Sequence, residues 1–472
     1  MARRVLKAGE RGGEDAGGAG KLMSTDPSGA ELGRHSVWVI DRIKDHARKI
    51  GSGITPSGGG ASYLESGVPL LRSQNVHFDG LRLDDVAFIA EDTHAEMAGT
   101  QLLTGDVLLN ITGASIGRCT FVPEGFGEGN VNQHVCIIRP SSRIDYRFLT
   151  YCLSAPWGQD QIFSSFTGAS RQGLGQRDLG QIQVPVPPLP EQERIAGYLD
   201  ASCAALDAAV AAKRRQIETL SNVRRSFIAQ AVTKGLDRRT ELRDSGVYWF
   251  GSIPKHWRCE HLKRFAARIQ TGCTPPTDTP DYYLDGTIPW FAPGSYDGDI
   301  ELGEPRKLIN ELARREGALR VFPAETVFLV GIGATIGKVG LIRAEAACNQ
   351  QLIGIVTNHR LLGRYLAYQY KIYEDVIPRI ASATTLPIFD QVKTGYLPTL
   401  QPPREEQEAI CTFLDAKLAE LKRIDAGIES QIATLVAYRK SLIHECVTGQ
   451  RRITQSDVAR SGGESRPEGR DS

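Results

Sequence analysis

The second half of this 472-residue chain restates the first half, and the repeat limits the folds that the chain can adopt. The copies are offset by about 215 to 220 residues, with Trp38 matching Trp257 and Lys44 matching Lys263. Each copy combines a mixed block of roughly 150 residues with a following helix of roughly 43. We therefore expect two similar units in tandem. The gap-free matching passages are 37–56 with 256–275, 106–118 with 326–338, and 187–233 with 402–448.

The segment that closes each copy predicts a coiled coil. Pro190 and Glu191 suit a helix start, and Gly235 suits the end of that helix. In between, apolar or small residues recur at alternating steps of about three and four, which is the heptad seam. Lys213 and Asp425 interrupt the seam, and polar seam residues can fix register at a cost in stability. The seam positions are 195, 199, 203, 206, 210, 217, 220, 227 and 231, then Ile410, Leu414, Leu421, Ile428, Ile432, Leu435 and Leu442.

The lengths of these segments predict how the blocks are arranged. At ~1.5 Å per residue each helix is about 65 Å long. The linker 235–250 is short, so the second block must follow at the far end of the first helix. The second helix can bury its seam only by returning antiparallel along the first. We expect two blocks at opposite ends of a rigid spacer, related by a pseudo-twofold axis.

The predicted fold class is thus α+β: two mixed α/β domains in tandem, joined by two long antiparallel coiled-coil helices. The two ends of the chain are rich in Gly, Ser and charge and are predicted to be disordered. The predicted boundaries are 1–35 (disordered extension, in which Met23 offers a second start position besides Met1), 36–187 (domain 1), 188–234 (helix 1), 235–250 (linker), 251–401 (domain 2), 402–448 (helix 2) and 449–472 (disordered tail).

Composition excludes several classes of protein. No stretch approaches the roughly 20 apolar residues of a membrane span, and no apolar signal core is seen, so a cytoplasmic protein is expected. None of the nine cysteines forms a CxxC pair, which predicts reduced thiols and no zinc site. The net charge of +1 does not mark a nucleic-acid binder, although 255–268 carries five Lys/Arg against one acid.

Catalytic signatures are missing from the sequence. Gly17–Lys21 resembles a phosphate loop, but Asp15 and Leu22 occupy positions that such a loop gives to Gly and Ser/Thr. No adenine-methyltransferase or HExxH motif is found. The Gly-rich segments 112–117 and 332–337 favour tight strand-to-strand turns with positive φ, whose backbone amides could still touch phosphate. We predict no catalytic residue, no metal site and no cofactor site in this chain.

Over nearly the whole of residues 36–448 the layout resembles the specificity subunit of type I restriction–modification enzymes. The resemblance lies in Pro-Pro-Leu-Pro-Glu-Gln-Glu at 187–193 with its copy at 402–408, and in the Gly-Ala-(Ser/Thr)-Ile-Gly turn of both halves. The motif Gly-Ser-Ile-Pro-Lys-His-Trp at 251–257 strengthens the resemblance, although the first block lacks a close copy of this motif. Each motif is loose alone, but their duplicated order is specific.

The resemblance implies a non-catalytic DNA reader for phage defence. Each target-recognition domain would read one half of a bipartite, asymmetric site in double-stranded DNA. The helices would dock two methyltransferase (modification) subunits, which methylate adenine with S-adenosylmethionine. Motor-nuclease (restriction) subunits, which use ATP and Mg, would then cleave unmethylated DNA. In the alignment of the two halves, Leu70–Asn75 corresponds to the unlike segment Trp290–Ser295. The two half-sites are therefore expected to differ.

Recognition would combine phosphate contacts by Lys and Arg with base contacts by Arg, Gln and Asn. The candidate DNA-binding residues of the first domain are Lys44, Arg48, Lys49, Ser52, Gly53, Thr55, Arg171, Gln172, Gln176 and Arg177. Those of the second domain are Lys263, Arg264, Arg268, Thr271, Thr274, Ser382 and Thr384.

Two alternatives stay open. A coiled-coil adaptor without sequence reading would bind DNA weakly and without sequence preference, or not at all. An enzyme with a cryptic nuclease or methyltransferase site would act without partners. Two differing blocks on a repeated scaffold argue against the first alternative, and the missing cofactor motifs argue against the second.

Overall fold

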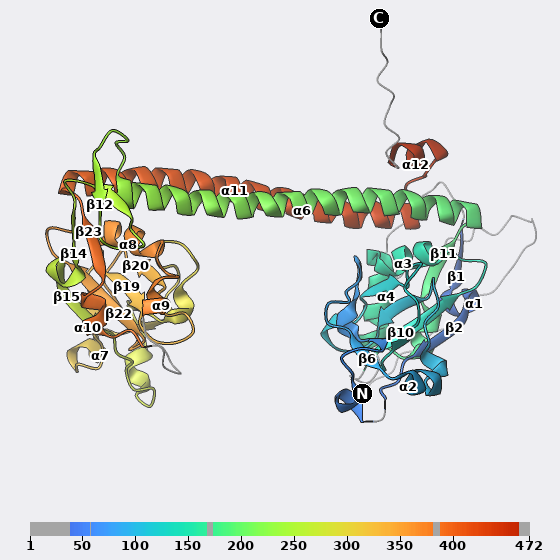
Figure 1. Ribbon diagram of the computed structural model, residues 1–472. Helices are drawn as coiled ribbons and strands as arrows, with labels where there is room; N and C mark the ends of the chain where they lie inside the picture. Colours follow the sequence, from blue (N-terminus) through green and yellow to red (C-terminus); the bar gives the residue numbers. More distant parts are fainter. Residues whose placement is uncertain (1–37, 57, 168–172, 381–387, 462–472) are drawn as a thin grey trace, which may run out of the picture. The chain divides into compact units, whose positions relative to one another are not determined.

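A computed structural model describes residues 38–56, 58–167, 173–380 and 388–461 (Figure 1). The chain forms two compact units. Unit 1 contains the described residues up to Val210 together with those from Ala433 onward, and unit 2 contains Ala211–Ile432. Each unit consists of a globular part, called its head, and portions of the two long helices.

Head 1 is built on a four-stranded sheet with the strand order β2-β10-β7-β8. A second sheet has the order β6-β3-β9, and β1 pairs with β11 where the head joins the helices. The bounds are β1 Val39–Arg42, α1 Ile43–His46, β2 Ala47–Ser52, β3 Val68–Leu71, β4 Val76–His77, β5 Gly80–Leu81, β6 Ala87–Ile89, α2 Glu91–Glu96, β7 Val107–Asn110, β8 Cys119–Phe121, β9 Asn130–Val131, β10 Val135–Pro140, α3 Tyr146–Ser154, α4 Pro156–Thr167, α5 Gln176–Gln181 and β11 Gln183–Val186.

Head 2 repeats this plan. Its four-stranded sheet has the order β15-β22-β19-β20, its second sheet has the order β17-β16-β21-β18, and β14 pairs with β23. The bounds are β12 Leu242–Asp244, β13 Ser252–Pro254, β14 Arg258–His261, β15 Ala266–Thr271, β16 Ile288–Phe291, β17 Lys307–Ile309, α7 Glu311–Arg315, β18 Val321–Phe322, β19 Val327–Val330, β20 Val339–Leu341, β21 Ala346–Cys348, β22 Leu352–Thr357, α8 Gly363–Lys371, α9 Ile377–Ile380, α10 Gln391–Gly395 and β23 Pro398–Gln401.

The two heads agree in pairing direction as well as in strand order. In both, the central strand of the second sheet is antiparallel to one neighbour and parallel to the other: β3 with β6 and β9, and β16 with β17 and β21. The α+β fold class and the tandem repeat expected from the sequence are confirmed.

Two long helices, α6 (Leu189–Lys234) and α11 (Arg404–Val447), follow the heads (Figure 1). In unit 1 the start of α6 shares a core with the end of α11, through Leu199, Leu442 and other buried residues. In unit 2 the end of α6 shares a core with the start of α11, through Val232 and Leu414. The helices are therefore antiparallel within each unit, as predicted. The expected placement of the two heads at opposite ends of a spacer stays a prediction.

The apolar part of α6 bears on the expectation that no segment of the chain spans a membrane. By length and composition this helix could cross a membrane, since one 18-residue window has a mean hydropathy of 1.3. Alanines raise this average without making the helix strongly apolar. In unit 1 the same stretch carries Asp200, paired with Arg147, and Asp207, paired with Arg439. The helix thus packs on protein through polar as well as apolar contacts.

Two segments are more ordered than the sequence suggested. The predicted disordered tail 449–472 includes α12 (Gln455–Ser461), and Ile453 before it is buried in the core of unit 1. Tail residues are held there because Arg194 donates a hydrogen bond to the Ile453 carbonyl. The predicted linker 235–250 contains β12, which pairs with β13 in a hairpin.

Candidate nucleic-acid interface

In each head, a glycine brings the last residue of an edge strand against a neighbouring turn. A Cβ on Gly53, just after β2, would lie 1.9 Å from the Val131 carbonyl oxygen. A Cβ on Gly272, just after β15, would lie 2.0 Å from the Cys348 carbonyl oxygen. Only glycine allows this approach, which explains why both copies carry it.

The residue before each glycine binds the first residue of a short helix. Gln176 of α5 donates to the Ser52 hydroxyl at 3.2 Å in head 1. Gln391 of α10 lies 3.1 Å from the Thr271 hydroxyl in head 2. The end of the edge strand and the start of the helix therefore form one polar surface in both heads. Of the predicted residues, Ser52 and Gln176 meet at this surface in head 1, and Thr271 lies at the equivalent surface of head 2.

A turn after β9 completes this surface in head 1. Asn132 is buried, and its side-chain oxygen accepts a hydrogen bond from the His134 backbone amide at 3.1 Å. His134 Nδ1 lies 2.7 Å from the Thr112 hydroxyl in the Gly-rich turn, and Gln133 is exposed between them. The turn is thus fixed from two sides.

Head 2 carries the equivalent turn after β21. Buried Asn349 accepts from the Gln351 backbone amide at 3.1 Å and donates to the Gln351 side chain at 2.9 Å. Exposed Gln350 accepts a hydrogen bond from the hydroxyl of Thr274, one of the predicted residues. The predicted strand-to-strand turns are confirmed beside these sites, with positive φ at Gly113, Gly117, Gly333 and Gly337.

The predicted cations of each head lie just before its edge strand and on the strand itself. Lys44 lies beside α5, where a Cβ on Gly180 would be 3.3 Å from it, and Lys263 lies in the same relation to Gly395 of α10. Lys49 on β2 and its equivalent Arg268 on β15 make different contacts. Lys49 donates to the Gly99 carbonyl, and Arg268 lies 4.7 Å from the Phe322 ring centroid.

The charged and aromatic neighbours of these cations also differ. Burial and the neighbouring Arg139 lower the pKa of Lys49. Lys263 stands over the Tyr396 ring at 3.7 Å, and Arg264 is 3.9 Å from Glu260. Arg48, Thr55 and Arg177 are exposed. The predicted residues Arg171, Gln172, Ser382 and Thr384 lie outside the described residues.

Each head is joined to its helix by a buried glutamine from the repeated Glu-Gln-Glu motif. Gln192 accepts from the Asp145 amide and donates to the carbonyls of Arg143 and Pro187. Gln407 accepts from the Leu362 amide and donates to the carbonyls of Arg360 and Pro402. The motif therefore positions the heads and does not itself form a recognition site.

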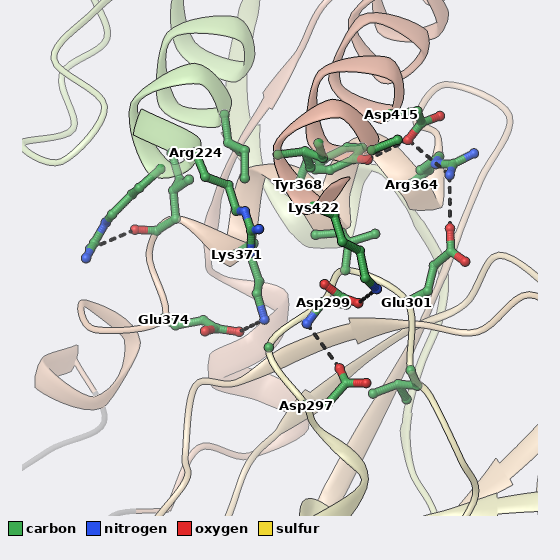
Figure 2. A pocket seen from close by; sticks show the side chains of 18 of the residues that line it. Arg224, Asp297, Asp299, Glu301, Arg364, Tyr368, Lys371, Glu374, Asp415 and Lys422 are labelled. Carbon is green, nitrogen blue, oxygen red and sulfur yellow. Dashed lines mark hydrogen bonds and ion pairs between the residues drawn. The ribbon is translucent and has the colours of Figure 1, made fainter. Parts of the chain in front are cut away.

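Unit 2 has a cavity of about 820 Å³ between its head and helices (Figure 2). Its charged side chains face one another in pairs: Lys422 with Asp299, Lys371 with Glu374, and Arg364 with both Glu301 and Asp415. Because these cations and acids neutralise one another, the cavity offers no concentrated charge to a ligand.

Sequence reasoning missed Gln133, Gln350 and Gln391. The signal for the first two was present, since an Asn-Gln pair follows the Gly-rich turn in both halves. Gln391 is the repeat partner of Gln176 at the offset of 215 that the alignment gives for the closing segments. Within the described residues, no cluster of three or more His, Cys, Asp or Glu residues could hold a metal ion.

Comparisons with known proteins agree with this architecture. The family model described as "Type I restriction modification DNA specificity domain" matches residues 88–219 and 256–434. The chain is 24% identical over 430 residues to the MjaX type I restriction enzyme specificity subunit of Methanocaldococcus jannaschii, covering 88% of this chain and 94% of that protein. It is 25% identical over 228 residues to the EcoBI specificity subunit of Escherichia coli, covering 46% of each.

A solved structure shares the fold. It was described as the structural basis underlying complex assembly and conformational transition of the type I R-M system. The TM-score is 0.67 with 16% identity, and the match covers 88% of this chain and 98% of that chain.

Proposed function

Because the chain belongs to the family of type I restriction–modification DNA specificity subunits, we propose that its two heads read the two halves of one bipartite, asymmetric DNA site. The DNA-recognition role in a restriction–modification complex comes with the family, in which this subunit is non-catalytic. The proposal adds that the two heads divide the recognition of the DNA site between them.

One observation carries the proposal: the same recognition surface occurs in both heads with different residues. His134 of head 1 stands where Gln351 stands in head 2, and Ser52 stands where Thr271 stands. A shared scaffold with unlike exposed groups suits two different base sequences, since the groups at the base edges decide which base is accepted.

The long helices supply the surface for partners in this proposal. Outside their narrow seam they expose large apolar side chains, including Val223, Ile424, Val436 and Tyr438. Such side chains on a helix pair suit protein partners. We assign this surface to two methyltransferase subunits, with motor-nuclease subunits joining the assembly. S-adenosylmethionine, ATP and Mg would be bound by those partners in the cytoplasm, and this chain would need no cofactor.

The test is genome-wide adenine methylation in the native host and in a strain lacking this chain. The proposal expects one split, asymmetric motif to lose methylation on both halves. Replacing residues 36–187 with those of a relative should then change one half of the motif and leave the other half unchanged. If the chain co-purifies with an active methyltransferase and no motif changes on deletion, the proposal is wrong and an adaptor role is favoured.

A further inference from the structure

The turns 132–134 and 349–351 hold their central residues rigidly. Gly53 donates to the Val135 carbonyl at 3.0 Å, and Asn132 donates to the Leu71 carbonyl at 3.0 Å. In head 2, Gly272 donates to the Leu352 carbonyl at 3.0 Å, and Asn349 donates to the Phe291 carbonyl at 3.0 Å. A side chain on such a turn projects from a fixed position, as base readout requires.

In head 1 a neighbour fixes the orientation of the exposed amide. Gln133 Nε2 lies 3.2 Å from His134 Nε2. An amide nitrogen only donates, so His134 Nε2 accepts and its proton is on Nδ1, which donates to the Thr112 hydroxyl. The Gln133 carbonyl oxygen has no hydrogen-bond partner among the described residues. Head 1 therefore presents an acceptor at this point.

In head 2 the neighbour acts on the opposite end of the amide. The Thr274 hydroxyl donates to Gln350 Oε1. The amide hydrogens of Gln350 have no acceptor within the part of the chain that the structure describes. Head 2 therefore presents a donor at the position where head 1 presents an acceptor.

We propose that Gln133 and Gln350 are specificity-determining residues that present opposite hydrogen-bonding edges to DNA, one in each head. This inference rests on the proposed function and names the groups that carry it out. In the major groove, the Gln133 carbonyl suits a base donor, which is adenine N6 or cytosine N4. The Gln350 amide hydrogens suit a base acceptor, such as guanine O6 or N7 or thymine O4.

Nearby cations support contact with DNA at this surface. Lys44 flanks α5, whose first residue, Gln176, binds the strand end beside the turn in head 1. Lys263 flanks α10 and its first residue, Gln391, in the same way. Phosphate contacts by these lysines would bring base edges toward the turns, since phosphate contacts set the register of a protein on the duplex.

The experiment measures binding of the chain, in complex with its methyltransferase, to DNA libraries in which every base occurs at each half-site position. Gln350→Glu removes the donor hydrogens with little change in size. We expect a loss of about tenfold or more in base preference at one position of one half-site, with the other half-site still read. Gln133→Leu should relax one position of the other half-site. Gln455→Glu, on α12, is the matched control and should change neither.

The unchanged half-site reports that the variant chain is folded. The inference is overturned if Gln350→Glu and Gln350→Leu both keep the wild-type base preferences, or if both abolish reading of both half-sites, since the latter marks a structural role. If the wild-type complex itself shows no base preference, the proposed function fails and the inference fails with it.

Discussion

The Tyr151 hydroxyl donates a hydrogen bond of 2.8 Å to Asp200 Oδ1 and so fastens α3 of head 1 to α6. Arg147 reaches the other oxygen of Asp200 at 3.1 Å. Head 2 has the same arrangement, in which Tyr368 donates to Asp415 and Arg364 pairs with it. Recurrence in both units indicates that this arrangement fixes the angle at which each head meets its helix.

Replacing Tyr151 with Phe should lower the free energy of unfolding of unit 1 by about 1 kcal/mol. A hydrogen bond to a carboxylate can be worth more, but the Asp200 side chain is 38% exposed and solvent screens it. Urea unfolding measures the change. Tyr248→Phe is the control, because Tyr248 is 98% exposed. Equal midpoints for the two variants would contradict a role for this contact.

The same contact predicts a loss of stability in alkali. Burial and Asp200 raise the pKa of Tyr151, so the folded chain holds this proton more tightly than the unfolded chain. The resulting stability is present below the unfolded pKa of about 10 and is lost as the pH rises above it. Urea midpoints measured between about pH 8 and pH 11 should therefore fall more steeply for the wild type than for Tyr151→Phe.

Gln192 should be among the least replaceable residues of the repeated motif. It is fully buried and makes three hydrogen bonds to backbone groups, so Gln192→Leu would leave one amide and two carbonyls unpaired. We expect a loss of about 3 kcal/mol or more. Glu193→Ala, next to it and exposed, should change stability by less than about 0.5 kcal/mol. Thermal unfolding of both variants decides whether the motif is structural.

Features with a regular period were predictable from sequence. The helices predicted at 188–234 and 402–448 run from Leu189 to Lys234 and from Arg404 to Val447, because a heptad seam is a local signal repeated many times. The ordered tail was missed because Ile453 and Val458 are too few to show a period, and their partners are distant in sequence.

The recognition surface was predictable only in part. The sequence pointed to Ser52 and Thr271, which end aligned strands, and to Thr274 just beyond the second strand, and their part in DNA binding stays a prediction. The repeated Asn-Gln pair marks the position of Gln350, but no local pattern reports the contact with Thr274, 76 residues away in sequence, that orients its side chain. The directions of Lys49 on β2 and of its equivalent Arg268 on β15 were not predictable either, because they depend on the register of each sheet.

Asp106 should stabilise head 1 through a contact that head 2 lacks. Its side chain is 1% exposed and receives two hydrogen bonds from Arg139, at 2.7 and 2.8 Å. The equivalent in head 2 is Thr326, which instead donates to the Pro323 carbonyl. Asp106→Ala strands a partly buried guanidinium and should cost about 3 kcal/mol. Thr326→Ala should cost about 1 kcal/mol. Hydrogen exchange resolved by peptide should show faster exchange in unit 1 only for the first variant.

The thiols should differ sharply in reactivity. Seven of the nine cysteines are buried, and Cys259 and Cys273 are partly exposed. Burial raises the pKa of Cys136 and of Cys446 to about 12, so neither forms the reactive thiolate near neutral pH. Native labelling at about pH 8 should modify Cys259 and Cys273 first, and denaturant should expose all nine. Rapid native labelling of Cys136 would show that head 1 opens readily.

In unit 2, Arg224 of α6 forms an ion pair with Asp425 of α11 at an N–O distance of 2.8 Å. Asp425 is the acidic residue that interrupts the heptad seam in the sequence. Asp425 Oδ1 and Arg224 Nε are buried without hydrogen-bond partners among the described residues, so the pair is incompletely satisfied. Such a pair costs stability, and breaking it costs more than replacing it with apolar residues. We therefore expect Asp425→Leu alone to lower the unfolding midpoint.

The double variant Arg224→Leu with Asp425→Leu should match or exceed the wild-type midpoint. A coupling of about 1 to 2 kcal/mol is expected from the double-mutant cycle, reduced from that of a fully buried pair because both side chains are about a quarter to a third exposed. A polar seam pair can also select one register. If so, the double variant should be stable yet mispaired, and crosslinking between cysteines placed on facing seam positions would detect the shifted register.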